Sequence, residues 1–250
     1  MRPASHNPGL GVPAGNDIEC DRRVARVTPE LTGMAASLAT IEMVQAAARR
    51  IQGVAHRTPV LTSSILDDKC GASVFFKAEC FQKTGSFKFR GAYNSVMSLD
   101  DGIAGKGVVT HSSGNHGQAL AAAAQLRGIP ATIVAPSTTA KSKLDAIKGY
   151  DARVVLCEPT QSARVSTMEA EAIAMGGATI LPPYDHLDVI SGQGTIATEF
   201  LEQVPDLDAI LVPTSGGGML SGVCTVTAAL SPGTRSIAVE PQGKRLEEVL

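Results

Sequence analysis

The sequence predicts an α/β fold organised around a parallel β-sheet. Short aliphatic runs alternate with stretches long enough for a helix, which is the pattern of repeated βαβ units. The composition agrees, because the chain of 250 residues has 25 glycines, 44% hydrophobic residues, only 4% aromatic residues and no Trp. Such chains are typical of parallel-sheet enzymes rather than β-sandwiches. Right-handed crossovers would place ligands at the C-terminal ends of the strands.

The chain begins with a segment that differs from the rest. Residues 1–33 are rich in proline and glycine and show no sustained period, so we expect a disordered leader, with Met34 as a candidate start. Acidic residues argue against a transit peptide, and an apolar signal sequence is lacking, so the expected location is the cytoplasm. The first helix is predicted at 41–52, and we expect Thr58-Pro59 to stop it.

Strands and helices then alternate along the chain. Each predicted strand is a short aliphatic run flanked by turn-forming or charged residues, and these strands are expected at 74–77, 107–110, 131–135, 153–156, 178–181, 209–212 and 236–240. The segments between them have the length and spacing of helices, which are expected at 86–98, 115–127, 139–149, 161–175, 190–203 and 217–230.

Composition and charge exclude several classes of protein. The net charge of −2 gives no basic surface for nucleic acid, and no apolar run approaches the ~18 residues of a membrane span. The five cysteines are scattered without a Cys-x-x-Cys pair, which argues against a disulfide framework or a zinc ribbon. We therefore expect neither nucleic acid nor a membrane as a partner.

A glycine loop follows the strand predicted at 209–212 and precedes a helix. Stacked glycines such as Gly216 and Gly218 let backbone N–H groups close on a phosphate at a helix N-terminus. The spacing to Gly222, with Glu240 ending the next strand, also resembles a dinucleotide fingerprint. A phosphate-bearing cofactor, a dinucleotide and a plain tight turn all remain open for this loop alone.

Lys88 lies between Phe87 and Phe89, about one turn into a helix expected to start after Gly85-Ser86. A lysine held between aromatic rings in a partly dry cleft would have a lowered pKa and become a usable amine nucleophile, as a Schiff-base lysine must be. The alternative is an ordinary solvated helix lysine.

A third loop, His-Ser-Ser-Gly-Asn-His-Gly at 111–117, follows the strand predicted at 107–110. Its hydroxyl, amide and imidazole groups, set around a glycine, can be aimed at a carboxylate or a ring oxygen. The same loop can instead start a helix, with Ser113 or Asn115 as the N-cap. Both interpretations can hold at once.

Four motifs, in order along the chain, resemble one enzyme family. ECFQKTGSFKFRGA at 79–92 resembles the lysine motif of the pyridoxal-phosphate enzymes related to tryptophan synthase β, and VTHSSGNHGQAL at 109–120 is similar to their serine racemase branch. SGQGT at 191–195 and SGGGM at 215–219 complete the set. The resemblance covers about residues 40–242, whereas the dinucleotide interpretation explains only one of the four loops.

The resemblance implies an α/β architecture of pyridoxal-phosphate fold type II, with two domains and parallel sheets. A large cofactor domain would consist of 34–106 and 185–250, and a small domain of 107–184 would be inserted in it, with the cofactor in the crevice between them. Relatives continue past the position of Leu250 through strands that supply a partner for the pyridine nitrogen, a second substrate-contacting serine and further metal ligands. The resemblance therefore implies that the C-terminal part of the large domain is missing.

The resemblance also assigns roles within the active site. Lys88 would carry pyridoxal phosphate and act as the base on one face of the substrate Cα, and Ser113 would be the acid on the opposite face. The other cofactor-binding residues would be Phe87, Asn115, Ser215, Gly216, Gly217, Gly218 and Met219. The substrate carboxylate would be held by Ser112, Asn115 and His116, with Arg164 near the substrate.

Two further sites follow from the same resemblance. An allosteric nucleotide site, with ATP as an activator, would be formed by Ser63, Ser64, Ile65, Lys83, Thr84, Gln118 and Tyr150. Glu240 matches a ligand of a divalent-metal site for Mg²⁺ or Ca²⁺. A homodimer is also implied.

The implied function is racemisation of serine, accompanied by β-elimination of serine to pyruvate and ammonia. Both reactions start from the same Cα carbanion, which the cofactor stabilises as an electron sink. One departure favours an L-threonine/L-serine ammonia-lyase instead, because Tyr184-Asp185-His186 stands where racemases carry Asn-Gln-Glu. An inactive truncated paralogue or isoform is the alternative from a different class. A small amino acid, serine or threonine, is the expected substrate of the active forms.

Overall fold

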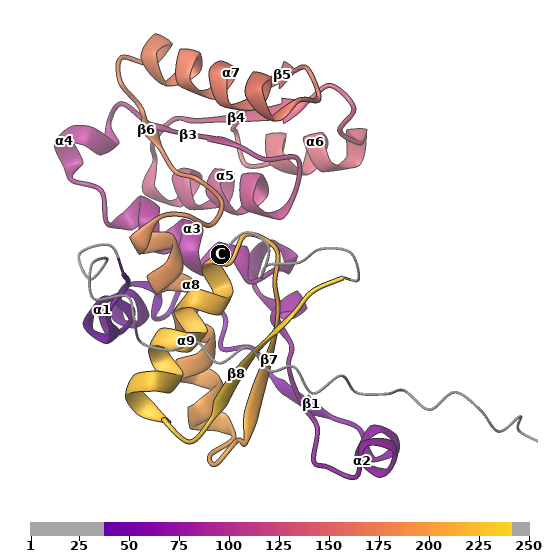
Figure 1. Cartoon of the computed structure of the whole chain (residues 1–250). Coiled ribbons are helices and arrows are strands. Elements are labelled where there is room, and N and C mark those ends of the chain that lie inside the picture. The colour runs from indigo at the N-terminus through magenta and orange to yellow at the C-terminus, as the bar shows by residue number, and fades with distance from the viewer. Residues whose placement is uncertain (1–37, 242–250) are drawn as a thin grey trace, which may run out of the picture. The chain divides into compact units, whose positions relative to one another are not determined.

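The computed structural model describes residues 38–241, in which helices and strands alternate (Figure 1). The leader expected at 1–33 lies outside the described residues. The α-helices are α1 (Ile41–Ile51), α2 (Ser64–Cys70), α3 (Lys88–Met97), α4 (Asp101–Ala104), α5 (Asn115–Arg127), α6 (Lys141–Lys148), α7 (Gln161–Ala174), α8 (Leu187–Gln203) and α9 (Gly218–Leu230). The strands are β1 (Val60–Thr62), β2 (Phe75–Lys77), β3 (Val108–His111), β4 (Ala131–Pro136), β5 (Arg153–Cys157), β6 (Thr179–Ile180), β7 (Ala209–Pro213) and β8 (Arg235–Val239). Two 3₁₀ turns, η2 (Glu79–Phe81) and η3 (Lys83–Gly85), precede α3.

The largest sheet has four parallel strands in the order β5-β4-β3-β6. In its register, Val108 of β3 pairs with Ala131 of β4 and with Thr179 of β6. Figure 1 shows α7 on one face of this sheet and α5 and α6 on the other. Because all four strands run in one direction, their C-terminal ends meet at one edge, where polar loops follow β3 and β4.

The other strands form two small sheets. β7 and β8 are parallel, as expected, and α9 connects them. β1, which the sequence did not predict, pairs with β2 in antiparallel fashion. The main sheet and the β7–β8 pair are parallel as expected, and only this short pair among the described strands is antiparallel. A strand of three residues with mostly exposed side chains carries too little periodicity to be recognised.

Three apolar clusters hold these layers together. The first lies between α3, α5 and the main sheet, with Phe89, Leu120 and Ile133 fully buried. The second joins α1, α8, α9 and β7, and the third packs α7 on the opposite face of the main sheet. α5 contributes a row of buried alanines, whose small side chains let it lie close to its neighbours.

The predicted alternation is confirmed, since every expected strand and helix has a counterpart whose ends match the expected ones or differ from them by up to three residues. Thr58-Pro59 does not stop the first helix, which ends at Ile51 because Gln52 leaves helical geometry and Gly53 turns with φ +75°. No helix within residues 38–241 is both long and apolar enough to cross a membrane. The expected small domain, 107–184, contains the four strands of the main sheet, and the division into two domains stays a prediction.

Candidate active site

Lys88 is the first residue of α3 rather than one turn into it, because the preceding segment forms the 3₁₀ turn η3. Its Nζ donates a hydrogen bond to the Pro183 carbonyl at 2.7 Å and lies 5.2 Å from the centre of the Phe87 ring. No carboxylate within residues 38–241 pairs with this amine. Burial therefore lowers the pKa of Lys88 from its ordinary 10.5 to about 8. The environment is that of an activated amine, not of a solvated helix lysine.

His116, in the first turn of α5, is fully buried beside this lysine. Its Nε2 lies 3.2 Å from the Leu181 carbonyl oxygen, whereas its Nδ1 is buried without a partner. Burial, reinforced by the positive charge of Lys88, lowers the pKa of His116 to about 3. The ring is therefore neutral at physiological pH, with Nε2–H donating to the carbonyl and Nδ1 left to accept a hydrogen bond.

The start of α5 lacks a side-chain cap. The N-cap is Gly114, so the expectation that Ser113 or Asn115 caps this helix is wrong. The Ser112 hydroxyl instead accepts a hydrogen bond from the Gly114 N–H at 3.3 Å, and Ser113 and Asn115 are exposed. The first-turn N–H groups of α5 have no intrahelical acceptors, which suits this helix end to an anion such as a carboxylate.

The glycine loop opens α9, which also starts without a side-chain cap at Gly217, with φ +80°. The loop packs tightly against Tyr184. A Cβ on Gly216 would lie 2.3 Å from Tyr184 Cδ1, and one on Gly218 would lie 2.7 Å from the Tyr184 carbonyl oxygen. Ser215 leads into this loop after β7, and Met219 packs partly buried at the start of α9. Larger residues at 216 and 218 would therefore displace the chain at 184.

One short segment joins all three loops, and the sequence reasoning did not foresee this role. Leu181 meets His116, Pro183 meets Lys88, and Tyr184 meets the glycine loop. Two of these contacts use backbone carbonyl oxygens. The sequence signals for this role are the Pro182-Pro183 pair, which was not interpreted above, and Tyr184, which was interpreted only as part of a departure from racemases.

Glycines also set how closely α3, α8 and α9 approach one another. A Cβ on Gly192 would lie 2.6 Å from Gly91 Cα, and one on Gly222 would lie 2.6 Å from the Gly194 backbone N. The 191–195 motif therefore serves helix packing: it fixes α3, which carries Lys88, and α9, which carries the glycine loop, on opposite sides of α8.

Arg90, two residues after Lys88, lies at the centre of a buried ion network that sequence reasoning missed. Its guanidinium donates to both oxygens of Glu79, at 2.8 Å each, and to both oxygens of Glu199, at 2.7 and 2.9 Å. Lys77 Nζ donates to Glu199 at 2.8 Å. Burial lowers the pKa of Arg90, but its bonds to the two glutamates more than compensate and hold that pKa above its ordinary value. Two cations and two carboxylates thus balance and clamp the first turn of α3.

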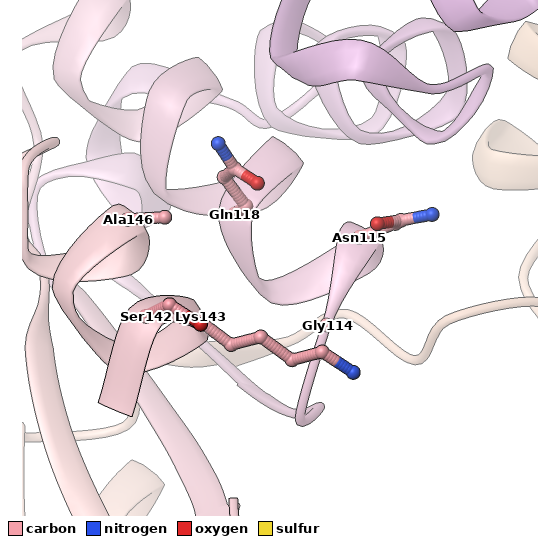
Figure 2. A pocket seen from close by; sticks show the side chains of 6 residues that line it. All are labelled: Gly114, Asn115, Gln118, Ser142, Lys143 and Ala146. Atoms are coloured by element: carbon pink, nitrogen blue, oxygen red, sulfur yellow. The ribbon is translucent and has the colours of Figure 1, made fainter. Parts of the chain in front are cut away.

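Two pockets flank the start of α5. One, of about 140 Å³, is lined by Gly114, Asn115, Gln118, Ser142, Lys143 and Ala146 (Figure 2). The other, of about 290 Å³, is lined by Ser113, Pro136, Thr138, Thr139, Ala140, Lys143 and Arg164. The structure thus brings Ser113 and Arg164 to one pocket, and Asn115 and Gln118 to its neighbour.

The predicted nucleotide residues fall into two groups. Ser63, Ser64 and Ile65 start α2, which Figure 1 shows away from α5 within the described residues. Lys83 and Thr84 belong to η3, which contacts α5, the helix of Gln118, and Tyr150 follows α6. Glu240 directly follows β8. Across residues 38–241 there is no group of three or more His, Cys, Asp or Glu side chains placed to hold a metal ion.

Comparison with known proteins agrees with this arrangement. The family model described as "Pyridoxal-phosphate dependent enzyme" matches residues 51–248. The chain belongs to this family.

Serine racemase of Arabidopsis thaliana is 49% identical over 205 residues, which cover 82% of this chain and 62% of the relative. A β-hydroxyaspartate dehydratase of Paracoccus denitrificans is 48% identical, covering 81% of this chain and 64% of the relative. The solved structure of maize serine racemase is 46% identical with a TM-score of 0.80, covering 82% of this chain and 62% of that one. The chain therefore spans less than two thirds of the length of each of these relatives.

The residues present fit the cofactor of this pyridoxal-phosphate dependent enzyme family. The aldehyde requires an amine that is partly neutral at physiological pH, and Lys88 has a pKa of about 8 with no carboxylate partner in the described chain. The phosphate requires backbone donors, and the uncapped start of α9 at the glycine loop provides them. The contacts through Pro183 and Tyr184 tie these two features to one segment.

Proposed function

We propose that this protein is a pyridoxal-phosphate-dependent serine racemase that also eliminates water from serine to give pyruvate and ammonia. The observation that carries the proposal is Lys88: a largely buried amine with a lowered pKa, beside a neutral histidine and tied through one short segment to a glycine loop. The similarity to serine racemases of plants supports the choice of substrate.

Cofactor binding is assigned to residues at three helix starts. Lys88 holds the aldehyde end and Phe87 lines the pocket. Asn115, at the start of α5, would donate to the ring oxygen, and the backbone from Ser215 through Gly216, Gly217, Gly218 and Met219, at the start of α9, would receive the phosphate. When bound, the cofactor supplies an electron sink that makes the Cα proton of the substrate acidic. The protein then needs only to orient the amino acid and to move protons.

Substrate orientation and proton transfer are assigned to the loop after β3 and to α3. Ser112, Asn115 and the uncapped N-terminus of α5 hold the carboxylate, whereas His116, expected to help hold it, offers only a hydrogen-bond acceptor at Nδ1 while its ring is neutral, which does not suit a carboxylate oxygen. Lys88 Nζ removes the Cα proton from one face, and the Ser113 hydroxyl returns a proton on the other, which inverts the centre. Elimination follows when the proton goes to the leaving Cβ hydroxyl. Arg164 lies in the same pocket as Ser113.

An L-threonine/L-serine ammonia-lyase is the second candidate, and the 184 position favours it. The Tyr184 ring packs on Gly216. The racemases that this chain resembles carry an asparagine at the position of Tyr184. Release of a keto acid without formation of a D-amino acid would support the ammonia-lyase over the racemase.

The remaining assignments rest on the resemblance. We propose that the protein forms a homodimer and lies in the cytoplasm. ATP would bind at the two groups of predicted nucleotide residues, and Mg²⁺ or Ca²⁺ would activate the protein with Glu240 as one ligand. Among the described residues, Glu240 does not belong to a cluster of three or more metal-ligating side chains.

The test is product analysis with the whole chain incubated with pyridoxal phosphate and L-serine. D-Serine and pyruvate are both expected. Ser113→Ala should lower D-serine formation by about 10²-fold or more, because it removes one of two proton-transfer groups, while pyruvate release falls much less. Equal loss of both products would make Ser113 structural. A chain that binds the cofactor fully and forms neither product would overturn the proposed function.

A further inference from the structure

The first turn of α3 carries Lys88, yet no side chain caps it. Phe87 holds the N-cap position without a side-chain hydrogen bond, and the Ser86 hydroxyl is buried without a partner in the described chain. Just before them, Thr84 adopts φ +60°, a left-handed conformation that a β-branched residue rarely takes. An uncapped helix end that follows a strained residue is prone to fray. Something other than a local cap must therefore hold Lys88 in place.

Arg90 supplies that hold from the other side of the helix. It lies two residues after Lys88, which places it about 200° further around the helix axis. Its side chain is fully buried. Its guanidinium donates to partners from separate parts of the chain: Glu79, the His56 carbonyl oxygen, and Thr195 and Glu199 of α8. Because each carboxylate accepts two bonds, the plane of the guanidinium is fixed as well as its position.

The partners of Arg90 are themselves anchored. The Thr58 hydroxyl donates to Glu79 at 2.6 Å. Lys77 Nζ donates to Glu199 at 2.8 Å and to the Thr58 carbonyl oxygen at 2.9 Å. The network thus joins the segment before β1, strand β2, η2 and α8 to one guanidinium, so the position of the first turn of α3 is determined by several elements at once.

The network acts on Lys88 through position rather than through charge. Its two cations and two carboxylates balance, whereas burial lowers the pKa of Lys88. The amine is held by the Pro183 carbonyl oxygen at 2.7 Å, and the flexible stem of a lysine would otherwise let it reach water. If the first turn loosened, the amine would become hydrated and its pKa would rise towards the ordinary value.

We infer that Arg90 is a positioning residue for Lys88: its paired bonds to two glutamates take the place of the missing cap and keep the amine buried against its carbonyl partner. The inference rests on the proposed role of Lys88 and adds a residue that acts through it. Arg90→Lys would keep the charge but lose the planar fork, so it could not bond both carboxylates in this way.

Trace acetylation of the whole chain, without cofactor or substrate, measures how much neutral amine Lys88 presents. Arg90→Lys should lower the acetylation rate of Lys88 at pH 7 about ten-fold, because a hydrated amine is more fully protonated. Arg57→Lys, the same substitution at an exposed ion pair with Glu202 of α8, is the matched control and should leave the rate within about two-fold. A thermal transition for each variant shows that it is folded. Unchanged acetylation of Lys88 in folded Arg90→Lys would make Arg90 purely structural and overturn the inference.

Glu79→Gln separates position from charge, and it decides the question if Arg90→Lys does not fold. The loss of one negative charge leaves the network net positive, which by electrostatics alone would lower the pKa of Lys88 and speed its acetylation. The loss of the paired bonds to Arg90 should instead slow acetylation, by about three-fold or more. Slower acetylation supports the inference, and unchanged or faster acetylation overturns it.

Cofactor attachment gives a second readout. Borohydride-trapped pyridoxal phosphate on Lys88 should fall in Arg90→Lys at pH 7 in parallel with acetylation, and the loss should shrink at pH 10, where an ordinary lysine with a pKa of about 10.4 is also partly neutral. A loss of equal size at both pH values would overturn the inference. Acetylation that depends on Arg90, in a chain whose Lys88 takes up no pyridoxal phosphate, supports the inference while contradicting the proposed function.

Discussion

The lowered pKa of Lys88 gives a measurable prediction that does not depend on turnover. With a pKa of about 8 rather than 10.5, about one amine in ten is neutral at pH 7. An ordinary lysine would have roughly one in three thousand. Lys88 should therefore present about 300-fold more neutral amine than an ordinary lysine, because burial removes water from its ammonium group.

Trace acetylation across pH 6 to 11, followed by peptide mass analysis, reports the titration of each lysine. Lys88 should titrate near pH 8. Lys141 is the internal control, since the hydrogen bond that it donates to the Asp145 carboxylate raises its pKa. Borohydride reduction of the chain with pyridoxal phosphate should label Lys88, and Lys88→Met should abolish that label. A Lys88 midpoint near 10, or a label on Lys83, would refute the assignment of the activated amine.

The same shift predicts how stability depends on pH. Because the pKa of Lys88 is lower in the folded chain than in the unfolded one, the unfolded state binds more protons between pH 8 and 10.5. The free energy of unfolding should therefore rise across this window, by up to about 3 kcal/mol. Urea unfolding at pH 7.5 and 10 measures this rise, which Lys88→Met should remove. A rise that persists unchanged in Lys88→Met would assign it to another group.

Two further predictions concern the support of α3. Gly192→Ala should lower the free energy of unfolding by about 2 kcal/mol, because its Cβ would lie 2.6 Å from Gly91 Cα and overpacking outweighs the gain in helix propensity. Gly149→Ala is the control, because a Cβ on Gly149 would have its nearest neighbours at 3.5 Å. In the same urea titration it should change the free energy of unfolding by less than about 0.5 kcal/mol. Equal effects of the two substitutions would contradict the close packing of α8 on α3. Arg90→Met should cost about 3 kcal/mol, because the part-buried Glu79 loses its ion-pair partner and Glu199 keeps only Lys77. Arg57→Met, which removes an exposed ion pair, should cost under about 1 kcal/mol, and a similar loss for both would show that the buried network contributes little.

Local signals account for the parts of the fold that were predicted. α5 runs over the predicted residues, since Gly114 and Gly128 bound a continuous helical stretch. The four strands of the main sheet are aliphatic runs between turn residues, and this pattern can be recognised without knowing which strands lie next to one another. The antiparallel pairing of β1 with β2 could not be found in this way, because three residues acquire their strand geometry from a partner about fifteen positions away.

The sequence by itself determined the chemical parts of the site: a lysine between two phenylalanines, a hydroxyl-rich loop after β3 and a glycine loop before α9. Only the tertiary structure decided how they meet. Leu181 and Pro183 act through carbonyl oxygens, which every residue has and no sequence pattern marks. The pKa values of Lys88 and His116 follow from burial by residues distant in the chain, and the ion network of Arg90 becomes visible only once its neighbours are placed. Desolvation and hydrogen-bond satisfaction are properties of packing, so they cannot be inferred from residue types alone.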